Sequence, residues 1–291
     1  MKKALFIFTA IIFGSIFTFG HAYTYLIRYN LMVMLFFAFL GIQVNWQLFN
    51  VTHFKILAIN IGLPLILYTI IQPFSANLAL IAFTVSIVPT AAAAPVIAQL
   101  LRTNVGEVTV SVILSTPIIA LLLPFLLTYF LKIEGNISLS NLVYPVLSLV
   151  FLPLIASQIL QKAPLKLKQT IASLDFISFP LFLTNIVIAC GNASFFVQNN
   201  QEVIGQELIG IFLLVSCLCV AQFKIGALIG KQTNPLTYSL ALGRKNTMIG
   251  LWMALSYFNP VIALGPIFYI VLHNVYNSYQ IWQVERERIT G

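Results

Sequence analysis

The sequence predicts an all-α membrane protein with ten transmembrane helices, arranged as two inverted five-helix repeats. Two observations predict this fold class. Apolar residues make up 60% of the 291-residue chain and charged residues only 8%, with a mean hydropathy of +0.98, whereas soluble domains are about 25% charged. Apolar windows of roughly 20 residues, the length that crosses a bilayer, also recur along the whole chain. Because each half has an odd number of spans, the halves must face in opposite directions.

The apolar windows are separated by short polar or Pro/Gly-rich joints that leave no room for a soluble domain. The expected spans are 3–20, 26–48, 54–73, 76–101, 105–131, 139–160, 171–196, 206–229, 235–257 and 260–281. The first follows Met1-Lys2-Lys3 and resembles a secretory signal. Since Phe19-Gly20-His21 lacks the small-x-small pattern of a cleavage site, we favour a retained first helix over a cleaved one.

The placement of Lys and Arg predicts the orientation in the membrane. The N-terminus and every second loop carry eleven cations, and the opposite loops carry only Arg28 and Lys132. The eleven are Lys2, Lys3, Lys55, Arg102, Lys162, Lys166, Lys168, Lys224, Lys231, Arg286 and Arg288. Because cytoplasmic loops are enriched in Lys and Arg, we expect a multi-pass protein of the cell (plasma or inner) membrane with both termini cytoplasmic. The net charge of +8 then reflects topology, and no nucleic-acid partner is expected.

The fourth and ninth spans are interrupted near their middles. Span 76–101 contains "VPTAAAAPV", with Pro89 and Pro95, and span 235–257 contains "LGRKN", with Gly243. Unwound backbone at bilayer depth must line a cavity or pack on protein. Interrupted spans at matching positions in two halves are typical of a transporter's binding site. We therefore expect the two interruptions to cross, although ordinary kinks would explain the prolines and the glycine by themselves.

Arg244 and Lys245 lie inside the second interruption. A cation at bilayer depth is costly and is usually kept for function, which argues against a simple kink. Half-helix N-termini would add positive dipole ends, and these suit an anion. The alternative, in which the span ends before Gly243 and the cations lie at the membrane interface, leaves too few residues on either side to cross the bilayer.

Other chemistry is sparse in the predicted spans. Cys190, Cys217 and Cys219 are expected to be small core residues, since Cys217 and Cys219 have no further metal ligands near them in the sequence. No metal, cofactor or nucleotide-binding loop is expected. A membrane-embedded enzyme would need convergent acid and base groups, and besides the cations the spans offer little more than His273. No enzymatic activity is therefore expected.

Two segments resemble a known family of transporters. "LALGRKNTMIGLWMALSYFNPVIALGPIFYIVLHNVYNSY" (240–279) resembles the last two helices of the bile acid:sodium symporter (BASS, SBF-like) family. The shared features are a Gly-x-x-Asn break, a Pro in the final helix and a late His-Asn pair. "VPTAAAAPVIAQLLRTNVGEVTVSVILSTP" (88–117) resembles the family's fourth and fifth helices, and it also resembles auxin-efflux-carrier-like proteins. The chain resembles a divergent bacterial-type member.

The resemblance implies a BASS-like transporter fold in which a core domain moves against a panel domain. The panel would comprise 1–50 and 136–200, the core 51–135 and 201–282, and 283–291 would be a cytoplasmic tail. Substrate would bind near the crossover, between the domains. The residues implied for the substrate and crossover site are Pro89, Thr90, Ala94, Pro95, Gly243, Arg244, Lys245, Asn246, His273 and Asn274.

The chain departs from the sodium-coupled members at the positions that would hold sodium. Where those members have an acidic residue and a Gln, this chain has Ala241 and Lys245. Their Ser-Asn pair is replaced by Ala94-Pro95, and their two hydroxyl residues are replaced by Val108 and Val112. Sodium is a hard cation that needs several oxygen ligands, so the usual sodium sites are not expected. We hypothesise that Lys245 replaces bound sodium as a fixed positive charge, and that Arg244 assists it or attracts an anionic substrate.

The expected function is secondary transport of a small organic anion, with membrane lipid around the protein. Because burial disfavours a charged lysine, Lys245 is also a candidate carrier of a coupled proton, whereas a permanent charge would equally serve a uniporter. An auxin-efflux-carrier-like transporter is an alternative. A third is a binding or receptor protein on the same fold that has lost transport, which would bind without flux.

Overall fold

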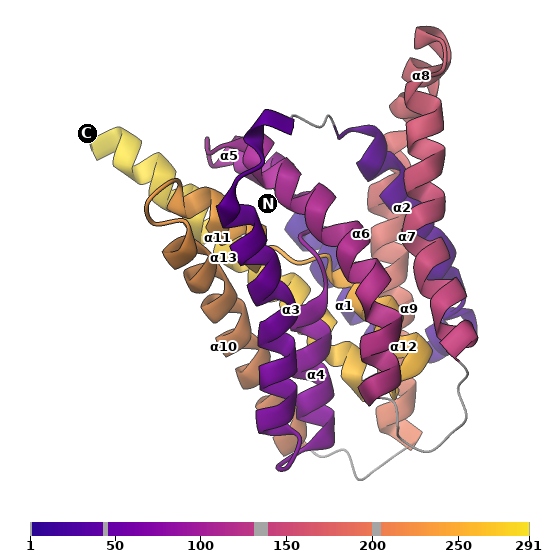
Figure 1. Ribbon diagram of the computed structural model, residues 1–291. Coiled ribbons are helices and arrows are strands. Elements are labelled where there is room, and N and C mark those ends of the chain that lie inside the picture. The colour runs from indigo at the N-terminus through magenta and orange to yellow at the C-terminus, as the bar shows by residue number, and fades with distance from the viewer. Residues whose placement is uncertain (1, 43–45, 131–138, 200–204, 291) are drawn as a thin grey trace.

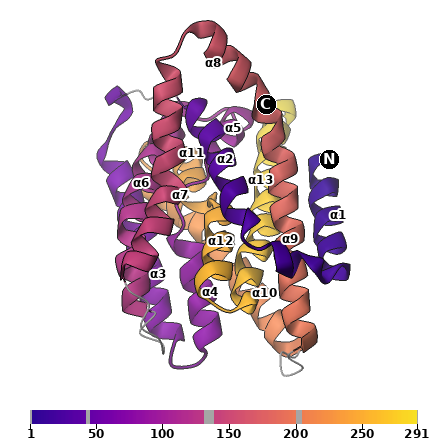
Figure 2. The same ribbon diagram turned by 90° about the vertical axis from the view of Figure 1, so that its right-hand side faces the viewer.

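The computed structural model describes residues 2–42, 46–130, 139–199 and 205–290. In these residues it is helical, apart from one isolated β-bridge, and most of the helices lie side by side in a bundle (Figures 1 and 2). The expected domain boundaries at 135/136 and 200/201 lie outside the described residues, as do Lys132, Glu134 and Glu202.

Each expected span contains one main α-helix or, for the fourth and ninth spans, a pair of α-helices, and short 3₁₀ helices adjoin several of them. In chain order the elements are α1 (Lys2–Ile16), the 3₁₀ helix η1 (Thr18–Tyr23), α2 (Leu26–Leu40), η2 (Trp46–Leu48), α3 (Val51–Ile71), α4 (Ala76–Ile87), α5 (Ala94–Leu100), α6 (Val105–Phe130), α7 (Leu139–Gln161), α8 (Leu165–Ala172), η3 (Ser173–Ile177), α9 (Ser178–Asn199), α10 (Gly205–Ile229), α11 (Pro235–Gly243), α12 (Thr247–Tyr257), η4 (Pro260–Ala263) and α13 (Leu264–Thr290).

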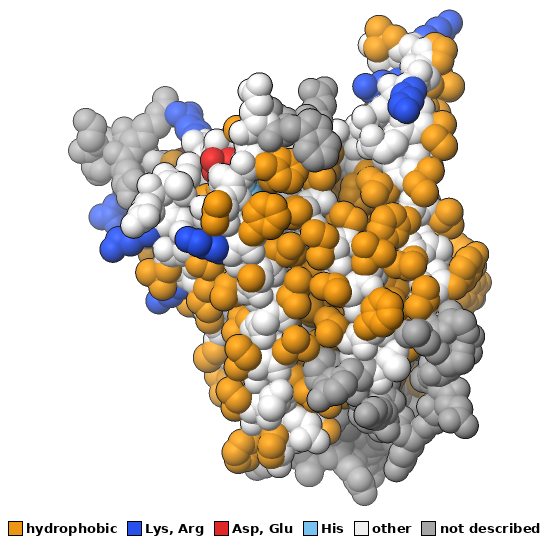
Figure 3. All heavy atoms as spheres, viewed as in Figure 1, with side chains coloured by type: hydrophobic (Ala, Val, Ile, Leu, Met, Phe, Trp, Pro, Cys, Tyr) orange, Lys and Arg blue, Asp and Glu red, His pale blue; other side chains and the backbone are white. Residues whose placement is uncertain are grey.

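Six helical segments of the described chain are long and apolar enough to cross a membrane. They are Val51–Ile71, Val105–Thr128, Leu142–Gln161, Leu165–Asn199, Glu207–Ile229 and Pro260–Arg286. Four apolar helices are shorter, namely Leu5–Ile16, Leu26–Leu40, Ala76–Ile87 and Thr247–Tyr257. Several long apolar helices indicate a multi-pass membrane protein. On the face in Figure 3, apolar side chains form a broad belt, and the Lys and Arg side chains gather toward one end of the molecule.

The helices pack in two groups. One contains α1, α2, α7 and α9, and the other contains α3, α4, α5, α6, α10, α11 and α13. The two groups meet where α6 packs against α7, where α13 packs against α9, and at α12, which contacts helices of both groups. In the first group α1 approaches α9 closely at Gly14, where an added Cβ would lie 2.6 Å from the Val187 carbonyl oxygen. Small residues allow such backbone contact between membrane helices.

Proline alone does not interrupt helices in this chain. Five prolines lie inside continuous helices: Pro64 in α3, Pro117 and Pro124 in α6, and Pro145 and Pro153 in α7. Neighbouring helices and local adjustment can satisfy the backbone groups that a proline frees. The interruptions between α4 and α5 and between α11 and α12 therefore have a further cause, which is the contact that these two segments make with each other.

One short helix differs from expectation. The polar joint "QKAPLKLKQT" contains α8, which begins directly after Pro164 and has no buried residue. A proline next to the first helical residue suits a helix start, because its fixed backbone angle is already close to helical. In both ribbon views α8 stands beyond the end of the bundle (Figures 1 and 2).

Candidate functional site

The candidate site begins where two interrupted helix pairs meet. In both ribbon views α5 and α11 lie toward the end of the molecule that carries α8, and α4 and α12 lie toward the other end (Figures 1 and 2). Between them, Thr90 and Lys245 form an antiparallel β-bridge. The Ala91 N–H donates to the Arg244 carbonyl oxygen and the Asn246 N–H donates to the Pro89 carbonyl oxygen, both at 2.8 Å. The expected contact between the two interruptions is therefore present, and each satisfies backbone groups of the other.

Side chains secure the free carbonyl groups at the end of α11. The last carbonyls of a helix have no partner within the helix. The Thr90 hydroxyl donates to the Ala241 carbonyl oxygen at 2.6 Å, and the Tyr269 hydroxyl donates to the Gly243 carbonyl oxygen at 2.8 Å. The Ser115 hydroxyl accepts from the Thr90 N–H at 3.2 Å. The junction is thus tied to α6 and α13 as well as to itself.

Gly243 is required by packing at this junction. It is the last residue of α11 and is buried, and a Cβ added there would collide with the ring of Phe223 on α10. The expectation placed Gly243 within the interruption, but the structure has the interruption at 244–246, one residue later. The glycine allows α10 to approach α11, and the extended residues that follow it make the break.

The ammonium of Lys245 is enclosed by oxygen atoms from two other helices. Lys245 is 1% exposed. Its Nζ donates to the Oδ1 of Asn60 on α3 and, at 2.8 Å, to the carbonyl oxygen of Ser86 on α4. The Asn60 amide also donates weakly to the Val88 carbonyl oxygen, at 3.5 Å. Carbonyl-type oxygens are also ligands of hard metal cations, which need several of them, and two such oxygens bind this ammonium.

Arg244 is directed to a different helix. It is 8% exposed, and both of its terminal nitrogens lie near the Oδ1 of Asn274 on α13, at 3.5 and 3.4 Å. One of them also donates to the Oδ1 of Asn277. The amide of Asn277 donates to Gln280, which in turn donates to the Ser239 hydroxyl at 3.3 Å. A chain of neutral amides therefore holds the guanidinium against α13.

The two buried cations have no anionic partner in the part of the chain that the structure describes. Every acceptor of Arg244 and Lys245 is a neutral amide or backbone oxygen. Burying an unpaired ion is unfavourable by several kcal/mol, even after the protein relaxes. The same described residues contain no group of three or more His, Cys, Asp or Glu that could hold a metal. The site therefore contains two buried basic side chains whose described partners are all neutral.

The remaining expected residues fall into two sets. Ala94 and Pro95 start α5, with the Ala94 N–H bonded to the Ala91 carbonyl oxygen at 2.8 Å. Pro95 lies in the first turn, where a missing N–H costs nothing, so it begins a helix and does not interrupt one. On α13, His273 is 5% exposed, and the Asn274 amide bonds the Ile270 carbonyl oxygen at 2.7 Å. Asn274 thereby presents its oxygen to Arg244.

Sequence reasoning missed several members of this site. The group comprises Asn60, Ser86, Ser115, Tyr269 and Asn277. An amide inside an apolar span needs a partner, so Asn60 could have been recognised as a polar contact between helices, although not its partner. Ser86 contributes only its backbone oxygen, so no feature of its side chain could have marked it.

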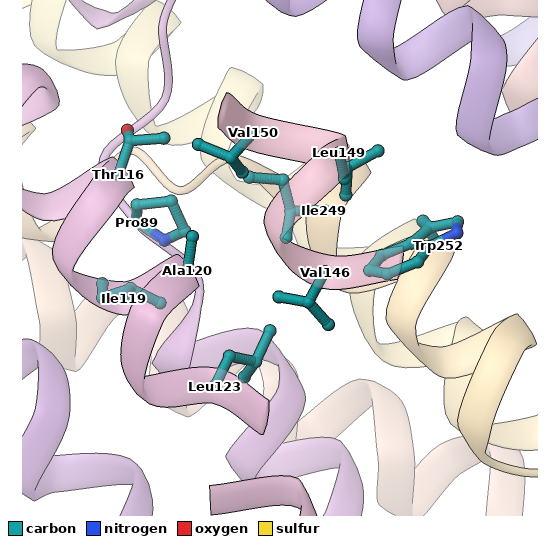
Figure 4. Close-up of a pocket in the computed structure, with 10 residues that line it drawn as sticks. All are labelled: Pro89, Thr116, Ile119, Ala120, Leu123, Val146, Leu149, Val150, Ile249 and Trp252. Atoms are coloured by element: carbon teal, nitrogen blue, oxygen red, sulfur yellow. The ribbon is translucent and has the colours of Figure 1, made fainter. Parts of the chain in front are cut away.

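A small apolar pocket lies beside the junction. Its cavity volume is only about 10 Å³, and it is bordered by Pro89 of the first interruption, together with residues of α6, α7 and α12 (Figure 4). The lining side chains are those of Pro89, Thr116, Ile119, Ala120, Leu123, Val146, Leu149, Val150, Ile249 and Trp252. Thr116 supplies the one hydroxyl among them. In this conformation the pocket therefore has room for about one water-sized molecule.

The fold and the site together define a multi-pass helical membrane protein in which two interrupted helix pairs meet at a cationic, oxygen-lined junction. Comparisons of the chain with models of known protein families and with curated proteins find no match.

Proposed function

We propose that the protein is a secondary transporter of a small organic anion, built on a BASS-like fold of ten spans in two inverted repeats, with Lys245 in place of a bound cation. One observation carries the proposal. The Lys245 ammonium lies at the junction of two interrupted helix pairs and is held by the oxygens of Asn60 and Ser86. Secondary transporters bind their coupling ions at such discontinuous helices, with unwound carbonyls as ligands.

A fixed ammonium would perform the structural part of sodium's role. It places positive charge among carbonyl dipoles of α3 and α4, and it leaves their oxygens occupied. Sodium would need several more oxygens, and the side chains of Ala94, Val108 and Val112 supply none. We therefore propose transport that does not require sodium. Coupling to protons through Lys245 and facilitated transport without coupling both remain within the proposal.

The substrate class follows from the charge and the neighbouring pocket. Arg244 and Lys245 are buried without an anionic partner in the described residues, which favours a negatively charged substrate. The pocket beside Pro89 is lined almost entirely by apolar side chains. We therefore propose a substrate with an acidic group and a small apolar body, and this pocket would have to widen to admit that body. A pocket between α7 and the α6–α12 side also agrees with the proposed movement of a panel domain against a core domain.

The proposed orientation places both termini in the cytoplasm. On the face in Figure 3, Lys and Arg lie toward the end that carries α8, and cytoplasmic segments of membrane proteins are enriched in these residues. The apolar belt below them would then face lipid in the cell membrane.

The test begins with binding and continues with transport. The purified protein would be melted with a panel of mono- and dicarboxylates and sulfonates, in sodium and in choline salts. A ligand at ten times its Kd stabilises by about 1.4 kcal/mol. A radiolabelled hit would then be offered to proteoliposomes under a sodium gradient, a proton gradient or neither, with wild type, Lys245→Gln and the exposed-site control Lys224→Gln.

We expect uptake without sodium in wild type and in Lys224→Gln, and greatly reduced uptake in Lys245→Gln. Uptake by the wild type that requires sodium would contradict the replacement of sodium by Lys245. Saturable binding with no uptake under any gradient would favour the receptor alternative.

A further inference from the structure

Two buried nitrogen atoms beside the junction have no hydrogen-bond partner, and either can donate a hydrogen bond, the imidazole in the tautomer that carries its hydrogen on Nδ1. They are the Nε of Arg244 and the Nδ1 of His273. Both side chains are more than nine-tenths buried, with exposed fractions of 8% and 5%. The terminal nitrogens of Arg244 are held by α13 amides, so its Nε is the position that stays free. An unpartnered buried polar group costs about 1–3 kcal/mol, which makes the pair unusual in one small region.

The two groups belong to the same local environment. Arg244 reaches Asn274 and Asn277 on α13, and His273 lies on the same helix, one turn before Asn277 and on the same face of the helix. The His273 ring stands edge-on to Tyr269, with centroids 5.6 Å apart and planes at 85°, and Tyr269 itself bonds the end of α11. The imidazole is thus positioned by α13 beside the guanidinium.

The chemistry at this point lacks a negative charge. The guanidinium contacts only neutral amide oxygens in the described residues, and Lys245, the next residue, is a second cation with neutral partners. An anion near Arg244 could accept hydrogen bonds from Nε–H and from the imidazole Nδ1–H and would offset the buried charge. Hydrogen bonds to charged groups are also stronger than those between neutral groups.

We propose that a small inorganic anion, such as chloride, binds between Arg244 and His273 as a permanent counter-ion of the junction. This site differs from the pocket proposed for the organic substrate, which is lined by α6, α7 and α12. The ion would offset the charge of Arg244, and the charge of Lys245 would remain to favour an anionic substrate. The extent of burial favours a single-atom ion over an organic anion. The inference depends on the cations and the two free donors, and not on whether the protein transports anything.

The experiment measures the melting temperature of the purified protein in detergent, without organic substrate, in choline chloride and choline gluconate at equal ionic strength. We expect a saturable stabilisation by chloride, about 3 °C at ten times its Kd, and the same behaviour with bromide. Arg244→Gln should abolish the difference between the salts, and the exposed-site control Lys224→Gln should keep it.

His273→Phe provides a second test in case Arg244→Gln does not fold. Phenylalanine keeps a ring against Tyr269 and removes the donor, so the half-saturating chloride concentration should rise by about tenfold, as expected for one hydrogen bond to a charged group. In crystals grown with bromide, anomalous scattering should place the ion between residues 244 and 273.

Equal melting of the wild type in the two salts would overturn the proposal, as would a chloride effect that survives unchanged in both variants. The result is separable from the transport assay. A chloride-insensitive protein that takes up an organic anion would overturn the counter-ion alone, whereas a chloride-sensitive protein without uptake would overturn only the transport function.

Discussion

Replacing Asn60 with leucine tests whether the side-chain oxygen of Asn60 stabilises the buried Lys245 ammonium. Leucine has nearly the shape of asparagine but offers no acceptor. In Asn60→Leu the ammonium would keep only the Ser86 carbonyl oxygen among its observed partners. A hydrogen bond to a charged group contributes about 1.5–3 kcal/mol, and the additional Asn60–Val88 bond, at 3.5 Å, is weak. We therefore expect Asn60→Leu to lower the free energy of unfolding by about 2–3 kcal/mol.

Combining Asn60→Leu with Lys245→Met isolates the contact between the ammonium and the Asn60 amide. Lys245→Met alone leaves the Asn60 and Ser86 oxygens unpaired, at about 1–3 kcal/mol each, offset in part because no charge is buried any longer. When both partners are apolar, the stability lost by breaking the Asn60–Lys245 contact should largely be recovered, since replacing both members of a buried polar pair can be nearly neutral. The double variant should therefore lose less stability than the sum of the losses in Asn60→Leu and Lys245→Met, and the difference should be about 2 kcal/mol.

The assay is the apparent melting temperature of the four proteins in one detergent. At roughly 2 °C per kcal/mol for a chain of this size, the single Asn60→Leu change should lower the melting temperature by about 5 °C. Asn192→Leu serves as the control amide, because its amide bonds the neutral hydroxyl of Thr24, and its effect should simply add to that of Lys245→Met. Additivity of Asn60→Leu and Lys245→Met within about 0.5 kcal/mol would refute the contact between the ammonium and the amide.

Three further substitutions test the junction and the pocket. Gly243→Ala should destabilise by about 1–3 kcal/mol through overpacking, because the new Cβ would meet the Phe223 ring; an unchanged melting temperature would mean that α10 is not in contact there. Thr90→Val should lower the melting temperature by several degrees, since it removes the 2.6 Å bond to the Ala241 carbonyl. Thr90→Ser keeps the hydroxyl and should melt close to the wild type. Equal melting temperatures of the two variants would mean that the Thr90 hydroxyl does not stabilise the junction. Ala120→Leu should more than fill the pocket beside Pro89 and reduce uptake of the organic anion if the pocket widens to hold substrate, whereas Leu121→Phe on the exposed side of α6 should leave uptake unchanged.

The positions of the helices could be read from the sequence because an apolar window and its polar ends are local properties. Six helical segments found in the expected spans are long and apolar, and four others are apolar but shorter. Glu107 lies in the first turn of α6, where an acidic residue suits the helix dipole. Prolines were a poorer guide. Pro117 and Pro124 lie within a continuous helix, whereas Pro89 lies in an interruption, and the residues themselves do not distinguish these cases.

The partners of the buried charges could not be read from the sequence. Asn60 and Lys245 are separated by 185 residues, and the pairing depends on how α3 packs beside the two interruptions. Arg244 and Lys245 stood out because cations in an apolar span are rare. That rarity indicated an important site, but only the fold shows that one cation faces α13 while its neighbour faces α3 and α4.

The Lys245 ammonium is attached to the protein chain, so it cannot leave the oxygens of Asn60 and Ser86 for either side of the membrane. This attachment has a thermodynamic consequence for the proposed transport. A sodium ion that dissociates on each side of the membrane lets its electrochemical gradient supply work to the substrate. A tethered ammonium has no concentration on either side, so it cannot transmit such work, however well it supports the junction. In the absence of a moving proton, a carrier of this kind would only equilibrate its substrate, and the steady accumulation ratio of a neutral analogue would be one at any sodium gradient.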